Sequence, residues 1–283
     1  MNTIKSNISK HALLTYFLLA FGITWGGILL LIGVDGILGT KAVADDVMPF
    51  VYLVTLLGPS VSGMVMIGLL EGRQGYANLC SKLAKWRFGV GWYAISLLTA
   101  PALILAILFV LSGTSADFLP AIVTTDDKTG LLILGIVMGL VVAFFEELGW
   151  STVAVPRLRQ RYGVLKSGII MGVLWGAWHF PLFLGSTRAS GTVPPALYLT
   201  ILLFSFLPAY RTLMVWVYDR TGSYLMAILM HAPLTGSQLV LIPAAIAGKQ
   251  LVTFDLVFGI ALWVLVILVF VFQKKESLVE GGI

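Results

Sequence analysis

Apolar segments of about 20 residues recur along this chain, and they constrain its fold more than any other feature. A helix needs about 20 residues to cross the roughly 30 Å hydrocarbon core of a bilayer. Inside that core every backbone polar group must find its partner within the protein, which favours helices. Only 11% of the residues are charged, against about 25% in a soluble domain. The sequence therefore predicts an all-α, polytopic protein that forms one membrane domain, residues 1–283.

Eight segments are apolar and long enough to be transmembrane helices. They lie near residues 12–33, 47–70, 91–112, 131–150, 165–184, 195–217, 223–243 and 252–272. Two other stretches, 71–88 and 155–162, place apolar residues at helical spacing among basic ones. This pattern is typical of amphipathic helices that lie on a membrane surface. We expect a bundle of about eight transmembrane helices with short interfacial helices.

The placement of Lys and Arg predicts the orientation of the bundle. The loops on one side of the membrane, counted with both chain ends, hold fourteen of the eighteen basic residues, and residues 211–222 are one of these loops. Both termini are therefore expected in the cytoplasm. The basic residues lie between apolar segments and form no stripe with exposed aromatics, so no nucleic-acid partner is expected. Cys80 is the single cysteine, which excludes an intramolecular disulfide and a multi-cysteine zinc site.

Glu146 and Glu147 directly follow the apolar run of residues 131–145. An ionisable side chain in a membrane helix costs about 2.5 to 3.5 kcal/mol on insertion scales. Two adjacent carboxylates are therefore expected to face the interior of the bundle, around a polar cavity in which other groups can pair with them.

His179 and His231 are the candidate partners of these carboxylates. Each lies in an apolar segment two residues before a proline, Pro181 or Pro233. A proline interrupts helical hydrogen bonding, and irregular backbone in a membrane must face a cavity or pack against protein. A rise of 1.5 Å per residue places both histidines and Glu146 about 16 to 20 Å from the cytoplasmic edge. The sequence predicts that the three side chains meet.

A glutamate and two histidines in an apolar cavity are suited to hydrolysis. The glutamate can take a proton from water, and the histidines can orient this water or donate to an oxyanion. Glu146, His179 and His231 also match the ligand types of catalytic zinc sites, in which the metal activates bound water. No His-Glu-x-x-His motif is present, so the spacing leaves open both a divalent metal such as zinc and a site without a cofactor.

The motifs around these residues resemble those of the CAAX-protease and bacteriocin-processing (CPBP, or Abi) family of intramembrane proteases. The first family motif is Glu-Glu-x-x-x-Arg, which here begins at Glu146. The second places an aromatic residue four positions before a histidine, as Trp175 precedes His179. The third is His-x-x-x-Asn or Asp, which here runs from His231 to Thr235. The resemblance implies a helical bundle that encloses an intramembrane active site.

The resembling core covers about residues 131–243, and it departs from the family pattern at two positions. Ser151 replaces the arginine of the first motif, so Glu147 is expected to lack its usual cation. Arg157 is an imperfect substitute because a spacing of six residues does not put both side chains on one helix face. Thr235 replaces the amide or carboxylate of the third motif; its hydroxyl can donate and accept hydrogen bonds but cannot act as a base.

By this resemblance the catalytic residues are Glu146, Glu147, His179, His231 and Thr235. Glu146 would activate water, the histidines would bind this water or polarise the scissile carbonyl, and Glu147 would support them. Some family members are described as metalloproteases and others as glutamate-type hydrolases, so the metal question stays open. The implied substrate is a membrane-embedded or lipidated peptide, such as a prenylated C-terminus, a leader or a signalling peptide. The implied location is the plasma membrane of a prokaryote.

A second hypothesis assigns no catalysis to the chain. A non-catalytic immunity or scaffold protein could use the same cavity to bind a peptide or membrane partner. This reading fits Ser151 and Thr235 better than catalysis does. An ion-coupled transporter is disfavoured because the sequence has no paired broken helices in repeat-related halves.

Overall fold

The computed structural model describes residues 3–184 and 193–280, and the regular structure in these ranges is helical. Seven helical segments are long and apolar enough to cross a membrane: α2 (Ala12–Ile37), α3 (Met48–Leu70), α5 (Val90–Ser112), Lys128–Arg159, Pro195–Thr221, α13 (Tyr224–Leu241) and Lys249–Phe272. An eighth apolar helix, α9 (Val164–Trp178), is shorter, with 15 residues. The chain is an all-α polytopic membrane protein, as predicted.

Several of these segments are composite or carry short neighbours. The fourth comprises α7 (Lys128–Gly149), η2 (Trp150–Ala154) and α8 (Val155–Arg159); the next comprises α11 (Pro195–Phe204) and α12 (Phe206–Thr221); the last belongs to α14 (Lys249–Glu280). The short helices are α1 (Thr3–Lys10), α4 (Gly72–Leu83), η1 (Ala116–Phe118), α6 (Ala121–Thr124) and α10 (Phe180–Leu184).

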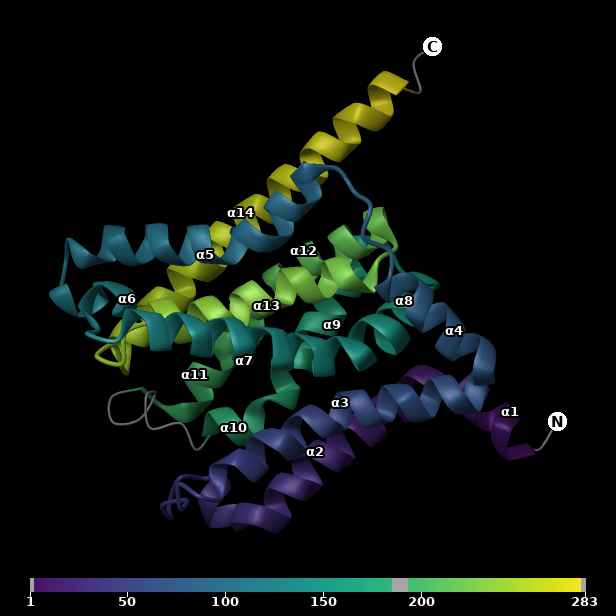
Figure 1. The fold of residues 1–283 in the computed structure, drawn as a ribbon, viewed down its shortest axis with the longest axis horizontal. Coiled ribbons are helices and arrows are strands. Elements are labelled where there is room, and N and C mark those ends of the chain that lie inside the picture. The colour runs from purple at the N-terminus through teal and green to yellow at the C-terminus, as the bar shows by residue number, and fades with distance from the viewer. Residues whose placement is uncertain (1–2, 185–192, 281–283) are drawn as a thin grey trace.

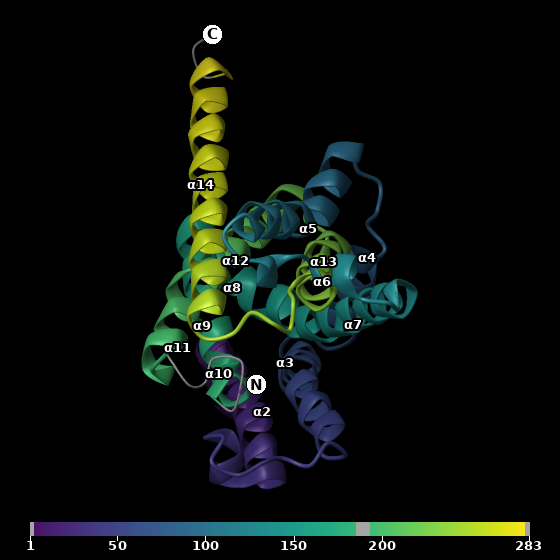
Figure 2. The same ribbon diagram turned by 90° about the vertical axis from the view of Figure 1, so that its left-hand side faces the viewer.

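Helices α7, α9, α12 and α13 occupy the middle of the molecule (Figure 1). The α2–α3 pair lies along one side of them, and α5 and α14 lie along the other. Helix α14 stands at a steep angle to α5 and α13 and extends beyond the rest of the bundle (Figure 2). The predicted site residues Glu146 and His231 therefore lie on central helices, shielded from lipid by their neighbours.

Glycines allow the central helices to approach closely. A Cβ added at Gly139 of α7 would lie 2.4 Å from the carbonyl oxygen of Ala232 in α13. A Cβ added at Gly172 of α9 would lie 2.4 Å from the backbone of Pro208 in α12. Small residues at such contacts let membrane helices pack backbone to backbone. Two close pairs result, α7 with α13 and α9 with α12, and they hold the polar residues of the interior.

The two prolines that follow the candidate histidines have different effects. The predicted span 165–184 is divided at His179 into α9 and α10, and Pro181 lies at the second residue of α10. Helix α13, in contrast, continues from Tyr224 to Leu241 through Pro233. The expected break beside His231 is therefore wrong, because close packing of α13 against α7 and α5 keeps this helix continuous.

One of the two predicted surface helices is also corrected. Residues 71–88 contain the separate helix α4, as expected, but the stretch 155–162 begins as a continuation of α7. A π-helical turn, Trp150–Ala154, joins α7 to α8. Val155 and Leu158 are buried in the bundle because their apolar side chains pack inward. Turns of this kind are frequent at functional sites, and this one directly follows the two glutamates.

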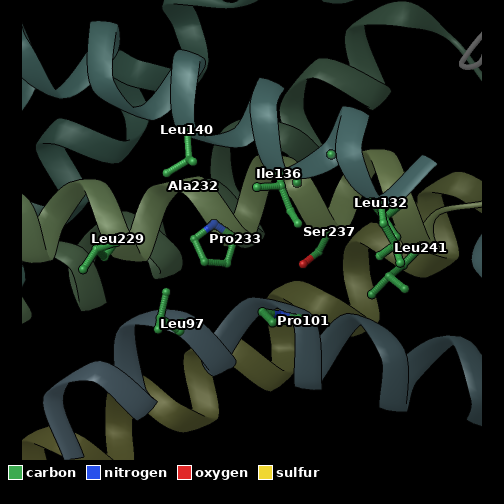
Figure 3. Close-up of a pocket in the computed structure, with 13 residues that line it drawn as sticks. Leu97, Pro101, Leu132, Ile136, Leu140, Leu229, Ala232, Pro233, Ser237 and Leu241 are labelled. Carbon is green, nitrogen blue, oxygen red and sulfur yellow. The ribbon is translucent and has the colours of Figure 1, made fainter. Parts of the chain in front are cut away.

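An apolar pocket of about 380 Å³ lies between α5, α7 and α13. Figure 3 shows Pro101 of α5 and Pro233 of α13 on its walls, with Leu132, Ile136 and Leu140 of α7 nearby. None of the predicted catalytic residues lines this pocket. Helix α13 therefore has an apolar face toward α5, and its polar face lies on another side of the helix.

Candidate active site

The polar face of α13 borders a second cavity, of about 310 Å³. Glu146 reaches it from α7, His179 from the end of α9, and His231 and Thr235 from α13. Most of the wall is apolar and includes Val142, Phe183, Tyr198, Leu202, Phe206, Leu207 and Leu251. The structure thus brings four of the five predicted residues to one cavity. The fifth, Glu147, lies behind its wall.

Glu146 is held by two indole groups. Its Oε2 accepts hydrogen bonds from Nε1 of Trp175, at 2.7 Å, and from Nε1 of Trp150, at 3.2 Å. Only 2% of Glu146 is exposed. Two donors on one oxygen fix the orientation of the carboxylate. No donor in the described part of the chain is found at Oε1, which leaves this oxygen for a ligand in the cavity.

His179 lies at the junction of α9 and α10. Its Nδ1 is 2.8 Å from the carbonyl oxygen of Trp175. A carbonyl can only accept, so Nδ1 carries the hydrogen and a neutral ring has an acceptor at Nε2. The ring stacks on Phe183, with 5.1 Å between centroids and 11° between planes. The broken helix therefore sets both the tautomer and the orientation of His179.

Glu147 is the centre of a buried polar network. Its Oε1 accepts hydrogen bonds from Nη1 of Arg211 and Nδ1 of His231, each at 2.8 Å. Its Oε2 accepts a hydrogen bond from the hydroxyl of Ser151. The side chains of Glu147, Arg211 and His231 are at most 1% exposed. Glu147 thus orients His231 and directs Nε2 of that ring toward the cavity.

Arg211 corrects two expectations. Glu147 does have a cation, which comes from α12 and not from the first motif. Arg211 was also counted in a cytoplasmic loop, whereas it lies inside α12, which continues to Thr221. Without Arg211, the loops assigned to the cytoplasmic side still hold most of the basic residues. The sequence could have indicated this ion pair, because an arginine next to an apolar span needs a buried partner.

Trp175 joins the two carboxylates. Its indole N–H binds Glu146, and the guanidinium of Arg211 lies 4.1 Å from the centroid of its ring. The edge-to-face contact with His231 has a centroid distance of 5.2 Å. A cation over an indole face is favourable, more so when it is desolvated. This one side chain therefore couples the orientation of Glu146 to the network behind His231.

Two further polar residues line the cavity. Gln238 follows His231 and Thr235 along α13 at spacings that keep all three on one helix face. Asp255 reaches the cavity from α14 and is 5% exposed. Neither residue was among the predicted site residues. Asp255 could have been noticed by the criterion that singled out Glu146, an acidic residue within an apolar span.

The zinc alternative requires three ligands around one point. Among the described residues, no three His, Cys, Asp or Glu side chains form a group that could hold a metal ion. Glu146, His179 and His231 are therefore not gathered around one point in this structure, and no chemical step is derived through a metal.

Comparisons with known proteins concern this same region. Residues 128–235 match the family model described as type II CAAX prenyl endopeptidase Rce1-like. CAAX prenyl protease 2 of Methanococcus maripaludis is 49% identical to this chain over 43 residues. This match covers 15% of the chain and 16% of the relative. The family match extends from the start of α7 to Thr235 and so contains all five predicted site residues.

Proposed function

Because residues 128–235 match the Rce1-like model of type II CAAX prenyl endopeptidases, we propose that the chain is an intramembrane endopeptidase acting on a membrane-associated peptide. One observation carries this proposal: Glu146, His179 and His231 meet at a small, largely apolar cavity. Such a cavity limits access of bulk water and strengthens the electrostatic interactions of the few polar groups within it.

Glu146 is assigned as the general base. It accepts a proton from a water molecule while the oxygen of that water attacks the scissile carbonyl carbon. The C–N bond then breaks, and Glu146 returns the proton to the leaving amine. Trp150 and Trp175 support this role because their indoles hold Oε2 and leave Oε1 for the water. Positioning of a base in this way is part of its catalytic contribution.

The remaining cavity residues are assigned to binding the water and the oxyanion. His179 presents Nε2 as an acceptor for a hydrogen of the attacking water. The hydroxyl of Thr235 and the amide of Gln238 are donors on the cavity wall, suited to the negative charge that develops on the carbonyl oxygen. Glu147 and Arg211 act through His231, whose ring they hold in place.

The substrate proposal follows the family description, which names prenylated CAAX sequences. We assign a lipidated or membrane-embedded peptide as substrate, with the bilayer delivering it to the cavity. The distribution of basic residues favours a cytoplasmic position for both chain termini. The binding-only alternative loses the support that it drew from Ser151, because Arg211 supplies the cation that Ser151 cannot. Thr235 still favours it.

The decisive experiment measures cleavage of lipidated peptides by the purified protein in liposomes. Glu146→Gln keeps the hydrogen-bonding shape of the side chain and removes the base, so cleavage should become undetectable. Glu71→Gln is the matched control, because Glu71 forms a surface ion pair with Arg157 at 3.4 Å. Equal cleavage rates in wild type and Glu146→Gln would contradict the assignment of the base.

A further inference from the structure

A third cavity, of about 390 Å³, lies at the end of the bundle where α1, α4 and α8 come together (Figure 1). Its volume is within the range of about 300 to 1,000 Å³ that is usual for ligand sites. Most of its wall is polar, and none of the predicted catalytic residues lines it. A ligand of this cavity would therefore be separate from the peptide that is cleaved.

Two helix faces supply most of the polar groups of this cavity. Asn78 and Lys82 lie one turn apart on α4, and Arg157 and Gln160 lie one turn apart at the end of α8. Side chains at these spacings share a helix face, and all four carry N–H donors. Oδ1 of Asn78 already accepts from Nε2 of Gln74, at 3.1 Å, which leaves Nδ2 as a donor. The two walls thus present donors to a ligand that accepts hydrogen bonds.

The ammonium of Lys82 is a half-buried charge in this cavity without an anionic partner. Its Nζ donates to the hydroxyls of Tyr218 and Tyr224, at 3.5 Å each. The two tyrosine rings stack with 2° between their planes, so they position the ammonium without neutralising it. Among the side chains that the structure describes, no carboxylate forms an ion pair with Lys82. A partly buried cation attracts an anion more strongly than a cation in open water does.

The other charged groups of the wall form a pair. Nη2 of Arg157 lies 3.4 Å from Oε1 of Glu71, and Nη1 donates to the carbonyl oxygen of Val153. The Glu71 side chain is 45% exposed, so part of its charge is screened by the solvent. Lys82 and Arg157 against Glu71 leave one positive charge among the described lining residues. The cavity therefore favours a ligand with negative charge.

The position of the cavity indicates where such an anion comes from. Helix α4 directly follows the membrane-spanning α3, and α8 ends the span Lys128–Arg159, so the cavity lies where both spans leave the membrane. The distribution of basic residues favours the cytoplasmic side, where the leaflet carries anionic lipids. Ile67, Leu70 and Leu79 add an apolar part to the wall, suited to the glycerol and first methylene groups of a lipid.

We propose that this cavity binds the phosphate headgroup of an anionic phospholipid, with Lys82 as the residue that pairs with the phosphate. Asn78, Arg157 and Gln160 donate further hydrogen bonds to its oxygens, and those from cationic groups are the stronger ones. The lipid links α4 to α8 and to the first turn of α13, where Tyr224 lies. Because the unfolded chain has no such cavity, the bound lipid stabilises the folded protein.

The test measures the affinity of phosphatidylglycerol for the purified protein in detergent micelles by native mass spectrometry. Lys82→Gln should weaken this binding about 10- to 100-fold, as for a lost hydrogen bond between charged groups. Arg73→Gln is the matched control, because it removes the same charge from an exposed position of α4 outside the cavity. Its effect should be much smaller. Equal affinities of wild type and Lys82→Gln, or equal losses in the two variants, would overturn the proposal.

A second variant guards against a folding defect in Lys82→Gln. Gln160→Glu places a carboxylate on the cavity wall at an exposed position, so it should also weaken the binding of phosphatidylglycerol; an unchanged affinity would contradict the site. Phosphatidylglycerol should raise the melting temperature of the wild type, and Lys82→Gln should lose this rise. Inorganic phosphate that stabilises the wild type as strongly at equal concentration would overturn the lipid as the source of the phosphate.

Discussion

Arg211→Ala should destabilise the protein by about 3 to 5 kcal/mol, the range for breaking a buried ion pair by removing one partner. The side chains of Arg211 and Glu147 are 1% and 0% exposed, and their atoms lie 2.8 Å apart. Without the guanidinium, the Glu147 carboxylate keeps only His231 and Ser151 as partners.

Ser151→Arg should restore much of this stability in the Arg211→Ala background. Ser151 lies one helical turn after Glu147, and its hydroxyl already binds Oε2 of that carboxylate. Removal of the Arg211 side chain leaves space for a guanidinium that approaches from η2. In the wild-type background the same substitution adds a second buried cation beside Arg211, and it should destabilise the protein.

The two substitutions therefore form a double-mutant cycle with a large coupling energy. The free energy of unfolding of all four proteins is measured in detergent micelles. Arg157→Ala serves as the control, because its partner Glu71 is 45% exposed and surface pairs contribute about 0 to 1 kcal/mol. A loss below about 1 kcal/mol for Arg211→Ala, or equal effects of Ser151→Arg in both backgrounds, would refute the reasoning.

Three further predictions concern the chemistry and the orientation. Trp175→Phe keeps the ring but removes the donor to Glu146, so kcat should fall about 10- to 100-fold, as for a lost hydrogen bond to a charged group; an unchanged kcat in a single-turnover assay would contradict the role of the indole. Elemental analysis of wild type and His179→Ala should find equal zinc contents, and one extra equivalent in the wild type would establish a metal site. Cys80, exposed on α4, should react with a membrane-impermeant maleimide in inside-out vesicles and not in right-side-out vesicles; the reverse pattern would invert the assigned topology.

The sequence by itself determined the helical membrane fold and selected the candidate site residues. Apolar length and the cost of charge in lipid are local properties, so they can be read along the chain without knowing which helices are neighbours. The same reasoning selected Glu146, His179 and His231, which the structure brings to one cavity. A proline next to His179 also indicated the break between α9 and α10 correctly.

Only the tertiary structure decided which charges face each other. Glu147 obtains its cation from α12, 64 residues away in the chain, and Asp255 reaches the cavity from α14. Both results depend on the rotation of each helix about its axis, which is fixed by backbone contacts such as that of Gly139 with Ala232. Pro233 did not break α13, because the neighbouring helices hold it in place. Partners of this kind cannot be assigned from one sequence. An apolar span shows that a charged side chain within it needs a partner, but it does not show which helix supplies that partner.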